Sequence, residues 1–102
     1  MNEENKPIVY LSGRMRGLSD YGRAQFHEAE KMLKGKGYAV INPAQLPIEI
    51  PFEHCMPICT SMIDGADMVA LLDGWEESPG AELEKKYAEY QGKPAVPIKH
   101  LL

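Results

Sequence analysis

The chain has 102 residues, of which 44% are hydrophobic and 25% are charged, and its formal net charge is −4. A chain of this length forms one domain around one core, and its composition is typical of a soluble globular protein. The negative charge argues against broad binding to nucleic-acid polymers or anionic membranes, and no apolar run approaches the roughly 18 residues that a membrane span needs.

The polar, acidic N-terminus is unlike a signal or transit peptide, so we expect a cytoplasmic protein whose residues 1–6 form a mobile lead-in. The only cysteines, Cys55 and Cys59, are spaced to share one helix face, where a disulfide is geometrically awkward. Together with His54 they fall short of a closed set of metal ligands. We therefore expect two reduced thiols, no metal and no cofactor.

The chain opens with an apolar run at residues 7–11, which does not alternate and so predicts a strand covered on both faces. The loop that follows, residues 12–17, holds two glycines and two arginines but matches neither the Walker nor the GxGxxG pattern. Its backbone amides and arginines could meet a phosphate or a carboxylate. Taken alone, the loop is more often a solvated turn.

A periodic segment over residues 21–36 predicts the first helix, with a cap at Ser19 and Asp20. Its inward face is expected to hold Phe26, Ala29 and Leu33. Residues 38–41 predict the next strand, which Asn42 and Pro43 end. The connection over residues 44–51 is rich in Pro and Ile, and its apolar side chains are expected to line either a ligand pocket or a subunit contact.

Residues 52–65 predict a second helix that is broken or kinked near Pro57. Residues 68–72 form the clearest buried strand, and Asp73, Gly74 and Trp75 follow at its carboxyl end. Trp75 could stack on a ligand, although packing is the slightly favoured role for such a large aromatic side chain.

Ser78 and Pro79 form a helix start signal, and a helical wheel drawn from Gly80 places Glu84 near the middle of an apolar arc. That arc holds Leu83, Tyr87 and Tyr90 on one side of Glu84, and Ala81 and Ala88 on the other. A carboxylate on the core side is costly unless it is paired or lines a cavity. Glu84 is therefore either a partly buried structural residue paired with an arginine or backbone amide, or a working carboxylate.

Residues 94–98 predict a last strand, and their two prolines place it at a sheet edge. Strands and helices thus alternate along the chain, which predicts a flavodoxin-like three-layer α/β sandwich with a parallel sheet of four or five strands. Ligands of such sheets bind beyond the carboxyl ends of the strands. The loops over residues 12–17, 42–43 and 73–78 are expected to converge there, next to Glu84.

Four segments together resemble the nucleoside 2-deoxyribosyltransferase superfamily, which includes the 2′-deoxynucleoside 5′-monophosphate N-glycosidases. The segments are YLSGRMRG at residues 10–17, NP at 42–43, ADMVALL at 66–72 and SPGAELE at 78–84. The most specific piece is the spacing of Ser78, Gly80 and Glu84 after a buried strand. The chain is most similar to the short phage- and prophage-associated members.

The resemblance implies that Glu84 is the nucleophile and that Tyr10 orients it. It also implies substrate contacts by Gly13 and Arg16 in the first loop, and a phosphate contact by Ser78. Ser12, Arg14, Asn42, Asp73, Trp75 and Gly80 complete the set of residues expected to bind substrate. The carboxylate would attack C1′ of a deoxyribosyl group and form a glycosyl ester, which water or a second base then resolves.

Two features depart from the family pattern. The acidic residue that helps protonate the leaving base falls near Cys59 or Ser61, which leaves Asp64 and Asp73 as weak candidates. The chain also ends at Leu102, without the final helix found in many relatives, which implies an apolar flank and a homodimer or larger homo-oligomer. The expected function is therefore cleavage or transfer of the N-glycosidic bond of a deoxynucleotide or deoxynucleoside. The alternatives are a non-catalytic nucleotide or nucleotide-sugar binding module and a phage accessory protein that acts on a host partner.

Overall fold

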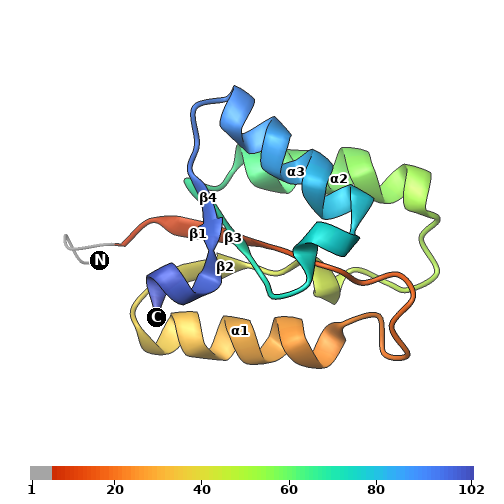
Figure 1. Ribbon diagram of the computed structural model, residues 1–102, viewed down its shortest axis with the longest axis horizontal. Coiled ribbons are helices and arrows are strands. Elements are labelled where there is room, and N and C mark those ends of the chain that lie inside the picture. Colours follow the sequence, from red (N-terminus) through yellow and green to blue (C-terminus); the bar gives the residue numbers. More distant parts are fainter. Residues whose placement is uncertain (1–5) are drawn as a thin grey trace.

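A computed structural model describes residues 6–102, and Figure 1 shows its arrangement in three layers. Of the segment predicted to be mobile, residues 1–6, all but Lys6 lie outside the described residues. The middle layer is a sheet made of four strands: β1 (Ile8–Ser12), β2 (Ala39–Ile41), β3 (Met68–Leu71) and β4 (Ala95–Pro97). All three pairings are parallel, in the order β2-β1-β3-β4. The predicted α/β sandwich of flavodoxin-like type is therefore confirmed, with four strands.

The helices cover both faces of this sheet. Helix α1 (Arg23–Gly35) lies below the sheet in Figure 1, whereas α2 (Phe52–Asp64) and α3 (Pro79–Tyr90) lie above it. Three short 3-10 turns complete the chain: η1 (Pro43–Gln45), η2 (Trp75–Glu77) and η3 (Ile98–Leu101). Helix α2 runs unbroken through Pro57, so the break predicted there is wrong.

Successive side chains of a strand point to opposite faces of the sheet, so the core consists of two clusters, one on each face. On the α1 side, Val9 and Leu11 of β1 pack with the predicted inward residues Phe26, Ala29 and Leu33. On the α2–α3 side, Tyr10 packs with Cys59, Ile63, Val69 and Ala88, among others. The two apolar faces explain why β1 and β3 are continuous runs of buried residues.

The strand order places the switch point between β1 and β3. The chain leaves β1 to form β2 on one side and returns to form β3 on the other side. The segments that follow these two strands therefore diverge at their carboxyl ends, where a crevice forms. As predicted from its prolines, β4 is an edge strand.

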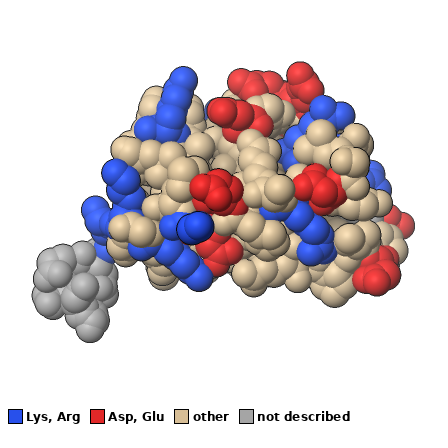
Figure 2. All heavy atoms as spheres, turned by 90° about the horizontal axis from the view of Figure 1, so that it is seen from below, with Lys and Arg blue, Asp and Glu red and all other residues tan. Residues whose placement is uncertain are grey.

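The molecular surface in Figure 2 is the α1 face, on which acidic and basic side chains are both scattered. No helix in the described part of the chain is long and apolar enough to cross a membrane.

Candidate functional site

Glu84 lies on the buried face of α3, as the helical wheel indicated, with only 7% of its surface exposed. Ser78 caps the helix by accepting a hydrogen bond from the backbone N–H of Ala81 at 3.1 Å, and Pro79 occupies the first turn. The buried face of α3 consists of Ala81, Glu84 and Ala88. Small alanines on both sides allow the helix to lie close to the sheet, so the carboxylate reaches β1.

The groups that meet this carboxylate come from β1. Tyr10 and Ser12 are two residues apart on the strand, so both side chains point to the α2–α3 side of the sheet. The Tyr10 hydroxyl donates to Glu84 Oε2 at 3.1 Å, and the Ser12 hydroxyl donates to Oε1 at 2.7 Å. Each carboxylate oxygen thus has a donor of its own. All three side chains are buried.

Burial and hydrogen bonding act in opposite directions on Glu84. Burial raises the pKa of its carboxyl group, while hydrogen bonds from Ser12, Tyr10 and the Cys59 thiol lower it, and the net shift is upward. The pKa of Tyr10 is raised well above its usual value, first by burial and then by the Glu84 charge. The phenol therefore stays protonated and serves as a donor.

Cys59 contributes to this site from α2, the helix that lies beside α3 on the same side of the sheet. Its thiol interacts with Tyr10 and Glu84, and burial raises its pKa to about 11. The superfamily that the sequence resembles is expected to have an acidic residue near this position, and the structure does bring Cys59 to the carboxylate. The group found there is a neutral thiol, however, and a neutral thiol is a weak hydrogen-bond donor.

A cavity of about 610 Å³ opens next to Glu84 at the carboxyl end of β1, between the segments that follow β1, β2 and η2. This volume lies in the range typical of small-molecule sites. Eight of the residues expected from the sequence line it: Tyr10, Ser12, Gly13, Arg14, Arg16, Ser78, Gly80 and Glu84. Residues far apart in the sequence are thus brought to one crevice. At Gly13, an added Cβ would lie 3.0 Å from the Leu72 Cβ, so the first loop passes close to β3.

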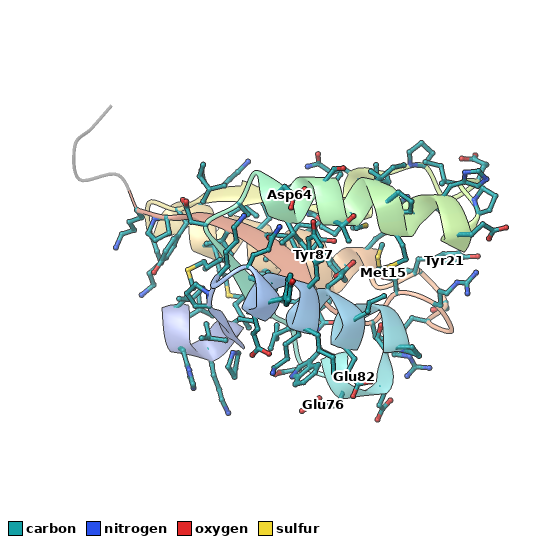
Figure 3. The ribbon with its side chains drawn as sticks, turned by 90° about the horizontal axis from the view of Figure 1, so that it is seen from above. Met15, Tyr21, Asp64, Glu76, Glu82 and Tyr87 are labelled. Atoms are coloured by element: carbon teal, nitrogen blue, oxygen red, sulfur yellow. The ribbon has the colours of Figure 1, made fainter. Side chains whose placement is uncertain are left out.

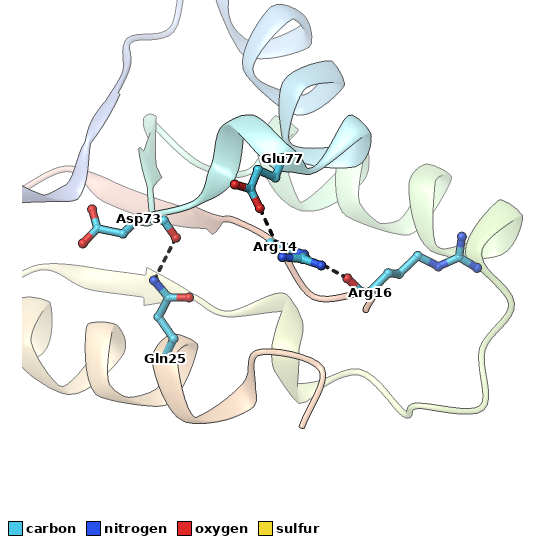
Figure 4. A network of polar contacts seen from close by, with 5 residues as sticks. All are labelled: Arg14, Arg16, Gln25, Asp73 and Glu77. Carbon is cyan, nitrogen blue, oxygen red and sulfur yellow. Dashed lines mark hydrogen bonds and ion pairs between the residues drawn. The ribbon is translucent and has the colours of Figure 1, made fainter. Parts of the chain in front are cut away.

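The other three residues expected to bind substrate are not among those that line the cavity. Asn42 is buried and caps η1, accepting from the Ala44 N–H at 2.8 Å and donating to Glu30 at 2.9 Å. Asp73 is exposed, and its backbone carbonyl accepts from Gln25 (Figure 4). Trp75 packs against the core on the α2–α3 side. The structure gives Asn42 and Trp75 packing or capping contacts, and their roles toward substrate stay predictions.

Asp64, a weak candidate for the missing acid, lies away from the cavity lining. It accepts hydrogen bonds from the Tyr87 hydroxyl at 2.8 Å and from the Gln91 amide at 2.7 Å, which joins the C-terminal ends of α2 and α3 (Figure 3). These bonds, led by that from Gln91, lower the pKa of Asp64. A carboxyl group with a lowered pKa is a poor proton donor, so Asp64 does not fill this role.

Arg14 of the first loop makes polar contacts with two residues. Arg14 pairs with Glu77 at 3.2 Å and donates to the Arg16 carbonyl at 3.3 Å (Figure 4). The ion pair connects the first loop to the η2 turn before α3, and it is partly exposed on both sides. Exposed pairs of this kind contribute little to stability, so Arg14 can exchange partners at low cost.

Several lining residues were not expected as individual contacts. Residues 46–51 form a largely apolar wall of the cavity, so this connection lines a pocket, which was one of the two roles expected of it. Tyr21 and Arg23 also line the cavity, although neither was singled out in the sequence. Arg23 Nη2 donates to the Leu46 carbonyl at 2.9 Å, while its buried Nε has no partner. Both flank Gly22, and that glycine was the available signal in the sequence.

Among residues 6–102, no group of three or more His, Cys, Asp or Glu side chains could hold a metal ion. Comparison with protein families gives one match, to a model described as Domain of unknown function (DUF4406), over residues 7–97. A search of curated proteins finds no match to the chain. The family match therefore covers the sheet, the helices and the whole site without stating an activity.

Proposed function

We propose that this chain, which belongs to the family described as Domain of unknown function (DUF4406), cleaves or transfers the N-glycosidic bond of a 2′-deoxynucleotide. The reaction proceeds through a covalent ester between the sugar and Glu84. The observation that carries the proposal is a buried carboxylate at a cavity, held by one hydroxyl on each oxygen. The resemblance to the nucleoside 2-deoxyribosyltransferase superfamily supports the same assignment.

The hydroxyl donors around Glu84 suit a nucleophile, because they fix the orientation of the carboxylate without taking its charge away. A carboxylate positioned in this way can attack a sugar carbon that develops positive charge in the transition state. Desolvation raises the energy of the charged form, and the hydroxyls of Tyr10 and Ser12 keep that form accessible. Burying the charged carboxylate costs free energy, and this cost disappears when the carboxylate becomes part of a neutral ester.

The reaction has two steps. In the first, Glu84 forms a bond to C1′ while the bond from C1′ to the base nitrogen breaks, and the base leaves with the bonding electron pair and takes up a proton. In the second, water attacks C1′, loses a proton and regenerates the carboxylate, which releases the sugar phosphate. A second base in place of water would give transfer.

A phosphate on the sugar is supported by the composition of the cavity. Gly13, Arg16 and Ser78 occur at positions that contact substrate in the monophosphate glycosidases, and all three line the cavity here. Guanidinium groups and backbone amides are common phosphate ligands. Arg16→Ala should therefore weaken the binding of a deoxynucleotide and leave that of the deoxynucleoside unchanged; equal losses would contradict the phosphate assignment.

The test of activity is incubation with each deoxynucleoside monophosphate, with free base measured by chromatography. The wild-type protein should release base, and Glu84→Gln should lower the rate by at least about a thousandfold, because an amide cannot form the ester. Glu82→Gln is the matched control, since Glu82 lies on the same helix but is exposed. If Glu84→Gln releases base at the wild-type rate, the proposed nucleophile is wrong.

The second candidate function is a non-catalytic module that binds a nucleotide or nucleotide sugar. It is favoured by the chemistry at Cys59, where a neutral thiol stands at the position of the expected acid. Tight nucleotide binding without base release, little changed by Glu84→Gln, would support this module. A phage accessory role toward a host protein would instead give no nucleotide binding and a specific partner in pull-down experiments.

We also propose a homodimer or larger homo-oligomer. Helix α3 exposes Leu83 and Tyr90, whose surfaces are 53% and 92% accessible, on its side away from the sheet. Such apolar side chains are typical of contacts between subunits. Light scattering should give a mass above that of one chain, and Leu83→Glu with Tyr90→Glu should lower it.

A further inference from the structure

Tyr21 has an unusual backbone conformation at the edge of the cavity. Its φ of 56° makes it the one residue other than glycine with a positive φ in the described part of the chain. The left-handed region costs a residue with a Cβ roughly 1–2 kcal/mol. Its side chain lines the cavity, yet 43% of its surface is exposed. Core packing therefore does not explain the choice of tyrosine over glycine here.

The neighbouring residues hold this conformation in place. The Tyr21 N–H donates to the Leu18 carbonyl at 3.0 Å. The Asp20 carboxylate accepts from the N–H groups of Gly22 and Ala24, at 2.9 and 3.0 Å. On the far side, Arg23 is tied to the Leu46 carbonyl. Hydrogen bonds hold the turn on both sides of Tyr21, so the segment that carries the ring is pre-organised. Strained backbone of this kind is often found at binding sites.

The cavity that Tyr21 lines is mostly apolar. Figure 3 shows Met15 and Tyr21 at the end of the molecule where α2 and α3 begin. Apolar side chains of the same cavity include Leu46, Ile48 and Ile50, with Glu49 the charged residue of that wall. A flat, largely apolar ligand group with polar edges matches this combination of an aromatic ring and aliphatic side chains.

We propose that Tyr21 is the platform on which the planar heteroaromatic ring of the ligand stacks. This inference rests on the proposed function, in which that ring is the nucleobase and the sugar lies toward Glu84. Stacking tolerates different bases because every base has a π-face, so Tyr21 would add affinity for the base without selecting one base. It would thus distinguish deoxynucleotides from sugar phosphates, which lack a base.

The experiment measures binding by calorimetry to a deoxynucleoside monophosphate and to 2-deoxyribose 5-phosphate, in the Glu84→Gln background to prevent turnover. Adding Tyr21→Ala should weaken nucleotide binding about tenfold, within the range of base stacking on an aromatic side chain, and leave sugar phosphate binding unchanged. Tyr21→Phe should keep wild-type affinity for both. Tyr38→Ala is the matched control, because Tyr38 is a half-buried tyrosine that does not line the cavity.

Tyr21→Gly separates ligand binding from folding. Glycine relieves the positive φ, so this variant should be at least as stable as the wild type and should bind nucleotide as weakly as Tyr21→Ala. Unchanged nucleotide affinity in both variants, or equal weakening of both ligands, overturns the role of Tyr21. In those cases base release by the wild type would leave the proposed function standing. A wild-type protein that neither binds nor cleaves any nucleotide overturns the proposed function and this inference together.

Discussion

Replacing Ser12 by alanine tests how the protein holds the Glu84 carboxylate. The Ser12 hydroxyl donates to Glu84 at 2.7 Å, and both residues are buried. A hydrogen bond to a charged group contributes about 1.5–3 kcal/mol, against about 0.5–1.5 kcal/mol for a neutral one. The loss of stability in Ser12→Ala should therefore approach the larger range when Glu84 is ionised and the smaller range when it is protonated. The loss should increase with pH.

The assay is urea unfolding of wild type and variant at several pH values from about 5 to 8.5. Ser78→Ala is the matched control, because its hydroxyl caps α3 through a backbone N–H and faces no titrating partner. The loss of this cap should cost about 0.5–2 kcal/mol at every pH. A cost of Ser12→Ala that does not change with pH, parallel to that of Ser78→Ala, would refute the claim that Ser12 stabilises the charged carboxylate.

Three further predictions concern stability and reactivity. The pKa of Glu84 is raised in the folded protein, so its contribution to stability is greatest below its unfolded pKa and is lost as pH rises through the folded pKa. Glu84→Gln should therefore gain thermal stability relative to the wild type as pH increases. A difference in melting temperature that stays constant with pH would contradict this. The Cys59 thiol, with a pKa of about 11, should resist iodoacetamide at pH 8 until the protein unfolds, as judged by mass spectrometry. Gly22→Ala should cost at least about 2 kcal/mol in urea unfolding, because φ is 72° and the new Cβ would lie 2.5 Å from the Arg14 carbonyl oxygen. Gly35→Ala, with open space around its Cβ, should instead be neutral or stabilising.

The layered fold could be predicted because it depends on local patterns that the sequence states directly. The continuous apolar runs of β1 and β3 indicated strands covered on both faces, and the prolines of β4 indicated an edge. The burial of Glu84 followed from helical periodicity. These features need only the geometry of one element at a time.

The rotation of α3 against the sheet was harder to predict. The helical wheel placed Leu83 and Tyr90 on the apolar arc with Glu84, yet both are exposed. Of the residues on that arc, the helix buries Ala81 and Ala88 beside Glu84, as the wheel allowed, because small side chains permit the closest approach to β1 and β3. Hydrophobicity alone does not measure this fit, which depends on the shapes of two elements far apart in the sequence.

Site residues at the ends of strands could be predicted, whereas a residue whose position depends on the conformation of a turn was missed. Ser12, which ends the central strand β1, and Tyr10, two residues before it on the same face, both line the cavity. Asn42 also ends a strand, but its amide is used to cap η1 and to bond Glu30. Tyr21 was missed because a positive φ at a tyrosine follows no residue preference.

In the proposed reaction, a leaving base must take up a proton, and few groups in the cavity could donate it. Within the described residues, the carboxylates that line the cavity are Glu49, Glu77 and Glu84. We propose Glu84 as the nucleophile, and Glu77 is paired with Arg14 at 3.2 Å. Glu49 lines the same cavity as Leu46, Ile48 and Tyr21. For the proposed reaction, the cavity thus offers Glu49 or water as the proton source for the base, and the Cys59 thiol as a further donor to the proposed nucleophile. The proposed nucleophile lies on a helix that is packed against the sheet, whereas Glu49 lies on the segment that connects η1 to α2.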